Sequence, residues 1–225
     1  MKLLAIDTST DYLSLALTRD GTVVAKVHRR LPMKHATLLV PTIAALLQKA
    51  RLSLASLDGF CVSVGPGSFT GLRIGVTTVK ALAYATGKPI VTVPTLDVIA
   101  HNALRHAGII CPVLDARKGK VYACVYRSDG AKLTRLSRYL LLPLSELTQK
   151  LAAYRDVVCL GDAAEKFFGE GGPAAGGARV FSPWHPRAEI AARCGVERFR
   201  KRRFVKASSL EPMYLYSREC AIKGY

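Results

Sequence analysis

The chain has 225 residues, half of them apolar, and its 33 lysines and arginines exceed its 16 acidic residues to give a formal net charge of +17. This length and apolar share exclude a disordered chain and fit one large domain or two lobes of about 100 residues each. The charge favours an acidic partner such as nucleic acid, an acidic protein surface or anionic lipid.

No signal for export or membrane insertion is found. No apolar run approaches the roughly 18 residues of a membrane span, and the apolar run after Lys2 is too short for a signal peptide. The cysteines form no CxxC pair, and four of the six stand in apolar runs, which is typical of reduced core thiols. They are Cys61, Cys111, Cys124, Cys159, Cys194 and Cys220. We therefore expect a cytoplasmic protein with no membrane association.

The first half alternates between strand and helix patterns. Strands are expected over residues 2–7, 12–18 and 22–28, which the turns "STD" and "RDG" join into an antiparallel meander. A helix over 36–50 follows, in which Pro41 must occupy the first turn or cause a kink. The remaining elements are a strand over 59–65, a glycine loop, a helix ending near Thr86, a strand over 89–93 and a helix over about 95–106. This alternation is typical of parallel connections in an α/β layer.

The second half repeats the opening plan. "CPVLD", "VYACVY" and "SDG" follow one another as "LLAID", "YLSLAL" and "RDG" do, and Asp115 matches Asp7. We infer a duplicated βββαβα unit, with lobes at 1–107 and 108–225 and a last segment that packs back on the first lobe. A helix over 143–154, a strand over 156–161, a short helix from Asp162, a loop over 169–178 and a final helix from about Pro186 complete the chain.

Two aspartates at strand ends are candidates for chemistry. Asp7 and Asp115 each close the first strand of a repeat, where an acid can hold a metal or a water beside nucleotide phosphates. An Asx-turn, in which the side chain binds its own backbone, is the structural alternative for each.

The glycine loop fits neither familiar phosphate motif. Gly65, Gly67 and Gly71 form GxGxxxG, one residue longer than the dinucleotide fingerprint, and the Lys-Ser/Thr pair of a P-loop is missing. Because the loop opens a helix, its amides could still receive an anion, and Ser68 or Thr70 could cap the first turn.

The helix after the loop has two faces that require burial. Gly71, Gly75, Thr78 and Leu82 share one face, and Leu72, Val76, Val79 and Ala83 share a second. A glycine inside a helix costs about 1 kcal/mol relative to alanine, so two of them indicate a close backbone approach. The approaching backbone could belong to a partner chain or to this chain.

Catalytic and metal-binding patterns are not found. The five histidines form no HxxxH or HExxH pair, and no GxSxG elbow is present. The segment "RCGVERFRKRRFVK" over 193–206 concentrates seven basic residues around Phe199 and Phe204. It could contact a phosphate backbone through Arg200, Lys201, Arg202 and Arg203, or form a solvated helix face with both rings in the core.

Four segments resemble the TsaB (YeaZ) family of bacterial tRNA-modification proteins. They are "AIDTST", "SVGPGSFTGLRIGVTTVKALAYATGKPIVTVPTLDVIA", "CPVLDARKGKVYACVY" and "EPMYLYSRE". The resemblance covers most of residues 1–126 and resumes at the C-terminus. It implies a two-lobed fold of the actin and sugar-kinase (ASKHA) class.

The resemblance also implies a role. The catalytic sister of this family, TsaD, carries a metal-binding His-x-x-x-His where this chain has Thr95 and Ile99, and neither side chain can bind the metal. It therefore implies a non-catalytic scaffold with no cofactor of its own, in a complex that uses ATP and a metal ion to modify adenosine 37 of tRNA. The implied partners are a TsaD-like subunit, a TsaE-like ATPase, tRNA through the complex, and a second copy of the chain when it is alone.

The implied partner interface is built on helices 36–50 and 71–86. Its candidate residues are Gly67, Ser68, Phe69, Thr70, Gly71, Arg73, Ile74, Gly75, Thr78 and Leu82. On this hypothesis Gly75→Leu abolishes pairing and leaves the chain folded. The chain departs from the family in its high charge and in Tyr216, where the family usually has Arg.

Two other functions stay open. One is a nucleotide-dependent enzyme that uses Asp7 and Asp115 around magnesium phosphate. The other is a nucleic-acid-binding module built on residues 193–206. A protease function, an older label for such sequences, lacks ligands and a nucleophile.

Overall fold

The structure is a computed structural model that describes residues 1–169 and 178–215. The chain forms two compact units, one made of Met1–Val98 with Pro186–Met213 and the other of Ile99–His185 with Tyr214 and Leu215. The expected boundary at residues 107 and 108 thus falls at 98 and 99. The reason is that Asn102 Nδ2 donates to the Trp184 carbonyl at 2.8 Å, and Ser128 Oγ donates to the Leu104 carbonyl, both within the second unit.

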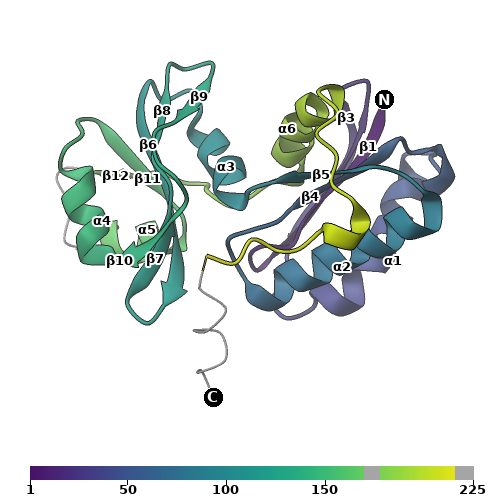
Figure 1. The fold of residues 1–225 in the computed structure, drawn as a ribbon, viewed down its shortest axis with the longest axis horizontal. Coiled ribbons are helices and arrows are strands. Elements are labelled where there is room, and N and C mark those ends of the chain that lie inside the picture. The colour runs from purple at the N-terminus through teal and green to yellow at the C-terminus, as the bar shows by residue number, and fades with distance from the viewer. Residues whose placement is uncertain (170–177, 216–225) are drawn as a thin grey trace. The chain divides into compact units, whose positions relative to one another are not determined.

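The first unit is built on a five-stranded sheet in the order β3-β2-β1-β4-β5 (Figure 1). Its strands are β1 (Lys2–Asp7), β2 (Tyr12–Arg19), β3 (Thr22–Arg30), β4 (Gly59–Ser63) and β5 (Ile90–Val93). Strands β1, β2 and β3 pair antiparallel as the predicted meander, while β4 pairs parallel to both β1 and β5.

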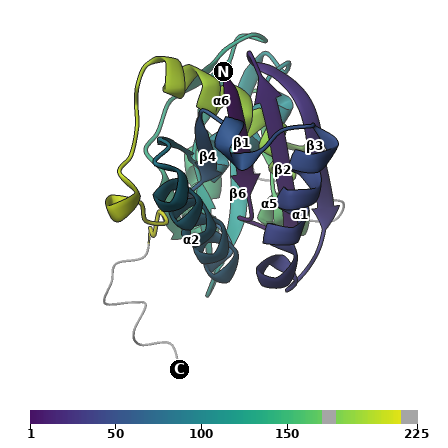
Figure 2. The same cartoon turned by 90° about the vertical axis from the view of Figure 1, so that its right-hand side faces the viewer.

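Helices cover both faces of this sheet, as Figures 1 and 2 show. The helices α1 (His35–Lys49) and α2 (Phe69–Thr86) lie on one face, and α6 (Ala188–Arg200) lies on the other. The period of two along β1 separates the two cores, because Leu4 and Ile6 join the α1 and α2 side while Ala5 joins the α6 side. Small residues on the α6 side let that helix approach the sheet closely.

The second unit repeats the topology of the first. Its strands are β6 (Gly108–Arg117), β7 (Lys120–Ala123), β8 (Tyr126–Ser128), β9 (Leu133–Arg135), β10 (Leu140–Pro143), β11 (Val157–Leu160) and β12 (Arg179–Val180). The order is β10-β7-β6-β11-β12, with β8 and β9 added beside β6. Strands β7 and β10 run antiparallel and β11 and β12 parallel, so the strands of this order match β3-β2-β1-β4-β5 of the first unit, while β8 and β9 are additional. The predicted duplication is confirmed.

Shorter helices differ most from the expectations. The helix expected over 95–106 is α3 (Thr95–Ala100) followed by the 3-10 turn η2 (His101–Ala103), and 143–154 is α4 (Leu144–Leu151). The short helix from Asp162 is α5 (Asp162–Phe168), and η1 (Leu54–Ser56) precedes β4.

Pro41 lies at the seventh residue of α1, beyond the first turn, and the helix continues to Lys49. Most of the expected loop over 169–178 lies outside the described residues.

The chain after α6 returns along the first unit. The Val205 backbone N–H donates to the Ile90 carbonyl at 2.9 Å, and the Met213 N–H donates to the Val64 carbonyl at 2.7 Å. Between them η3 (Ala207–Ser209) packs against α2, and Leu210 is buried. This segment therefore packs on α2 and is hydrogen-bonded to β5 and to the residue after β4.

Candidate partner surface and strand-end turns

The glycines of the α2 region face the turn after β1 of the same chain. A Cβ on Gly67 would lie under 3.0 Å from the Ser9 carbonyl, and a Cβ on Gly71 would lie as close to the Thr8 carbonyl. A Cβ on Gly75 would meet Thr8 Oγ1 within the same limit. The prediction that Gly71 and Gly75 admit a partner's backbone is therefore wrong, because Thr8 already occupies that space.

Hydrogen bonds within the chain also use the amides of the glycine loop. The Ser68 N–H donates to the Ser9 carbonyl at 2.8 Å, and the Gly71 N–H donates to Ser68 Oγ at 3.3 Å as a helix N-cap. Thr8 Oγ1 donates to the Gly71 carbonyl at 2.7 Å. The loop thus seats α2 on the end of β1, and two amides that could have received a phosphate are already bonded.

The outer side of α1 and α2 exposes apolar side chains. Val40 is 59% exposed, Phe69 51% and Tyr84 65%, and the Arg73 guanidinium stacks on the Phe69 ring at 3.9 Å. We call this the α1/α2 surface, defined by Val40, Ala44, Phe69, Arg73 and Tyr84. The two helices lie side by side (Figure 2). Exposed apolar groups on neighbouring helices are typical of interaction sites.

The predicted interface residues divide between this surface and the core. Ser68, Phe69, Thr70 and Arg73 are exposed, Gly67, Ile74, Thr78 and Leu82 are half-buried, and Gly71 and Gly75 are buried. Sequence reasoning missed Val40, Ala44 and Tyr84. The helical spacing placed Arg73 and Tyr84 on one face, but an exposed apolar residue has no sequence signature that separates it from a core residue.

Asp7 is fully buried at the end of β1. Its Oδ1 accepts hydrogen bonds from the Ser9 N–H at 3.0 Å and from Ser9 Oγ at 2.8 Å. Its Oδ2 has no hydrogen-bond partner among the described residues. Burial raises the pKa of Asp7 above its ordinary value, although nearby hydrogen bonds oppose the shift. The Asx-turn alternative thus describes Asp7.

Asp115 occupies the matching position in the second unit and is partly exposed. Its Oδ1 accepts from the Arg117 N–H at 2.7 Å, and its Oδ2 lies 3.5 Å from Lys166 Nζ. The neighbouring Asp162 carboxylate accepts from the N–H groups of Asp115 and Ala163, and burial raises the pKa of Asp162. Asp7 and Asp115 belong to different units, and each carboxylate bonds its own turn.

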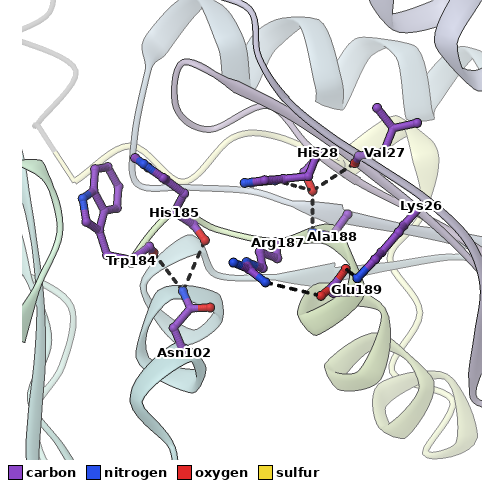
Figure 3. Close-up of polar contacts among 10 residues, drawn as sticks. Lys26, Val27, His28, Asn102, Trp184, His185, Arg187, Ala188 and Glu189 are labelled. Carbon is purple, nitrogen blue, oxygen red and sulfur yellow. Dashed lines mark hydrogen bonds and ion pairs between the residues drawn. The ribbon is translucent and has the colours of Figure 1, made fainter. Parts of the chain in front are cut away.

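Ser14 and His28 form a contact that the sequence did not indicate. Ser14 Oγ lies 3.2 Å from His28 Nδ1 and accepts from the Ala188 N–H at 2.9 Å, so it anchors the start of α6. Figure 3 labels His28 and Ala188, the two partners of this hydroxyl. Glu189 adds an ion pair with Lys26 at 2.7 Å. Ser14 is only 2% exposed, so this serine–histidine pair fixes α6 and presents no nucleophile at the surface.

Metal and thiol chemistry find little support in the described part of the chain. No group of three His, Cys, Asp or Glu side chains is placed to hold a metal ion there. The five cysteines that the structure describes are free, and four of them are buried. Burial raises the pKa of the Cys194 thiol to about 11, which keeps it protonated at neutral pH. No helix among residues 1–169 and 178–215 is long and apolar enough to cross a bilayer.

The basic residues singled out from the sequence lie at the C-terminal end of α6. Arg200, Lys201, Arg202 and Arg203 are all exposed, and we call them the basic turn. Phe199 is half-buried and meets Phe204 edge-on at 4.9 Å, while Phe204 remains 43% exposed. Of the two rings, Phe199 therefore packs against the core and Phe204 does not.

The duplicated βββαβα topology defines the actin and sugar-kinase-like (ASKHA) class of fold. An activator of 2-hydroxyisocaproyl-CoA dehydratase from Clostridium difficile shares the fold at 11% identity, with a TM-score of 0.52 over 96% of this chain and all of that one. Its solved structure holds ADPNP. At this identity the likeness shows the fold alone.

Comparisons with relatives identify the family. The model for TsaD, tRNA N6-adenosine threonylcarbamoyltransferase, matches residues 25–160, and the chain belongs to this family. The TsaB biosynthesis protein of Bacillus subtilis is 40% identical over 136 residues, which are 60% of this chain and 59% of that protein. A Pseudomonas aeruginosa protein described as similar to peptidase YEAZ superposes with a TM-score of 0.82 at 28% identity, covering 96% of this chain and 99% of that one. The resemblance to TsaB (YeaZ) is confirmed.

Two features of the sequence differ from the pattern of the TsaD and TsaB families. Thr95 and Ile99, which stand where the resemblance places the sister's metal-binding histidines, are fully buried in α3. Tyr216 lies outside the described residues, so its departure from the family pattern has no structural account.

Proposed function

We propose that the chain is a non-catalytic scaffold subunit in the transfer of a threonylcarbamoyl group to adenosine 37 of tRNA. It pairs with a TsaD-like catalytic subunit and recruits a TsaE-like ATPase. The name of the Bacillus relative, a tRNA threonylcarbamoyladenosine biosynthesis protein, supports the pathway, and the matched region is three fifths of that protein. The α1/α2 surface is the single structural observation that supports pairing.

The physical case for pairing rests on the kind of side chains this surface exposes. Val40, Phe69 and Tyr84 would each lose contact with water on docking, which is favourable by about 25 cal/mol per Å² of apolar area. Alanine at position 44 allows a partner helix to approach closely, and Arg73, stacked on Phe69, offers a charge that a partner carboxylate would match. In the free protein the same surface pairs two copies of this chain.

The scaffold contributes binding surface and no reacting group. Thr95 and Ile99 replace the sister's metal ligands and are buried, so the metal ion and ATP belong to the partner complex. Asp7 is enclosed, and Asp115 is bonded to its own turn and to Lys166. These contacts favour the scaffold over the nucleotide-dependent enzyme.

Reconstitution tests the proposal. Purified catalytic subunit, ATPase and adenylate-forming enzyme are assayed for tRNA modification with and without this chain, and the chain alone is assayed for ATP hydrolysis. We expect modification to require the chain and the chain to hydrolyse no ATP by itself. Modification that proceeds equally without the chain refutes the scaffold role, and intrinsic turnover lost in Asp7→Ala supports the enzyme.

A surface variant locates the interface. Val40→Asp with Phe69→Asp places two charges in the α1/α2 surface, and we expect loss of co-elution with the catalytic subunit at micromolar concentration. Leu136→Asp is the control for a charge placed on an exposed apolar residue elsewhere, because Leu136 is 39% exposed in the second unit. Both proteins should keep the wild-type melting temperature. Pairing that survives the double change excludes this surface.

A further inference from the structure

The basic turn at the end of α6 carries charge that the fold does not use. Arg198 of the same helix has partners, since it donates to the Thr92 carbonyl at 2.9 Å and lies 3.7 Å from an Asp97 carboxylate oxygen. Arg187 lies 3.8 Å from Glu189. Within residues 1–169 and 178–215, the four side chains of the basic turn form no ion pair. Four adjacent exposed cations repel one another, so their presence requires another explanation.

The backbone of the basic turn is held in place. The Lys201 N–H donates to the Glu197 carbonyl at 3.1 Å, and the N–H groups of Arg202 and Arg203 donate to the carbonyls of Phe199 and Arg198 at 2.9 Å each. Val205 then bonds Ile90 of β5. The four cations therefore extend from an ordered backbone that is fixed to the sheet at both ends. Less conformational entropy of the backbone is then lost when a ligand binds.

We propose that the basic turn binds the ribose-phosphate backbone of RNA. Three of its four side chains are arginines, whose planar guanidinium groups bind phosphate through paired hydrogen bonds. The half-exposed Phe204 ring lies beside them, and exposed rings next to arginines are typical of surfaces on which unpaired bases stack. The proposal deepens the scaffold function by giving this chain its own contact with the tRNA substrate, and in that respect it rests on the proposed function.

A lipid surface fits the observations less well. A helix that binds in a membrane interface needs a free apolar face beside its basic one. The apolar residues of α6, including Ala191, Ala192 and Val196, are buried against the sheet. Phe204, 43% exposed, follows the basic turn directly in the chain and is a single ring, not an apolar face. Basic charge without an apolar face favours a ligand bound through phosphate contacts.

The test measures binding of the full chain to an unmodified tRNA transcript over a series of salt concentrations. The variant R200Q/K201Q/R202Q/R203Q removes the charge and keeps polar side chains, and R200E/K201E/R202E/R203E reverses it. Each phosphate contact contributes about 0.7 to 0.9 to the slope of log K against log salt, so we expect the glutamine variant to lower that slope by about 3. Its affinity should fall roughly tenfold to hundredfold at moderate salt.

A matched control separates this surface from overall charge. Lys118, Lys132, Arg138 and Arg155 are exposed cations of the second unit, and their replacement by glutamine removes the same charge. We expect this control to keep most of the affinity and slope. Equal losses in both quadruple variants, or binding to phosphatidylserine vesicles that is lost in the variant while RNA binding is unchanged, would overturn the proposal.

Reconstitution keeps this proposal distinct from the scaffold role. In that assay the glutamine variant should raise the KM for tRNA about tenfold, leave kcat unchanged and co-elute normally with the catalytic subunit. If modification does not need the chain at all, the scaffold role fails while the binding experiment still decides the RNA contact. An unchanged slope and affinity refute the RNA contact and leave the scaffold role intact.

Discussion

The two strand-end turns share one topology and are stabilised in opposite ways. The turn after β1 packs against the glycines of α2, and the Asp7 side chain at the end of β1 is fully buried. Near the end of β6 the matching Asp115 side chain is 19% exposed and bonded to Lys166, beside the turn that follows this strand. A turn held by close packing requires glycines in the segment that faces it, because an added side chain would collide with the turn. A turn held by polar contacts requires the side chains that make those contacts. Substitutions should therefore affect the two turns differently.

We expect the largest loss of stability at Gly161, a position in the second unit that has no room for a side chain. A Cβ on Gly161 would lie under 3.0 Å from the Val113 carbonyl, and Gly161 has a φ of +127° that other residues rarely adopt. Overpacking against backbone and an unfavourable φ add, so Gly161→Ala should lower the free energy of unfolding by about 4 kcal/mol. Urea unfolding measures this loss.

Gly119→Ala is the control for backbone strain alone. Gly119 also has a positive φ, of +70°, but a Cβ there meets nothing within 4 Å. We expect it to cost about 1 kcal/mol. Equal effects at the two positions would show that strain, and not contact with Val113, makes Gly161 necessary.

The next effect distinguishes backbone from side-chain contact in the first unit. Gly75→Ala would place its Cβ against Thr8 Oγ1, and Gly71→Ala would place its Cβ against the Thr8 carbonyl. Each should cost about 2 to 3 kcal/mol on thermal or urea unfolding. The expectation that Gly75→Leu leaves the chain folded is wrong, because the larger leucine side chain would also meet Thr8.

A second substitution should rescue only one of these variants. Thr8→Ala removes Oγ1, after which the nearest Thr8 atom to the new Cβ at position 75 is Cβ itself, at 3.6 Å. Thr8→Ala itself loses the hydrogen bond to the Gly71 carbonyl, so the effects are compared in the Thr8→Ala background, where Gly75→Ala should cost little and Gly71→Ala should keep its full cost. Rescue of both would mean that the turn after β1 moves as a unit and is not fixed by packing.

The buried carboxyl of Asp7 predicts an effect of pH. Its pKa is raised by burial, so its contribution to stability is fully present below about pH 3.8, its ordinary value, and is lost as the pH rises through the folded-state pKa. Asp7→Asn keeps an oxygen to accept from Ser9 and cannot ionise. The stability of Asp7→Asn relative to wild type should therefore increase from acid toward neutral pH.

Asp129→Asn provides a control of opposite sign. Hydrogen bonds from the N–H groups of Ala131 and Lys132 lower the pKa of Asp129, so its contribution is present above the ordinary value and is lost as the pH falls. The wild type should exceed this variant more at neutral pH than in acid. If Asp7→Asn behaves in the same way as Asp129→Asn, then Asp7 is stabilised as a carboxylate and the turn after β1 is not closed.

Much of this fold could be predicted from the sequence because the signals are local. The three-strand meanders, the duplicated plan and the burial of the cysteines follow from alternation, turn residues and apolar runs. The partner of Gly71 and Gly75 could not be predicted, since Thr8 lies more than 60 residues away and a glycine indicates close approach without naming the neighbour. Ser14 and His28 were missed because their meeting depends on strand register and on Ala188.

The smallest effect is expected for the ion pair in the second turn. Lys166 Nζ and Asp115 Oδ2 are 3.5 Å apart, and the lysine side chain is 61% exposed, so water and salt screen the attraction. Lys166→Gln should cost about 0.5 kcal/mol or less, as should Lys150→Gln, which breaks the exposed pair with Glu146 at the same distance. Asp162 would still bind the Asp115 N–H and keep the turn after β6 in place. A loss above about 1.5 kcal/mol for Lys166→Gln alone, reduced by added salt, would instead show that charge holds this turn as firmly as packing holds the turn after β1.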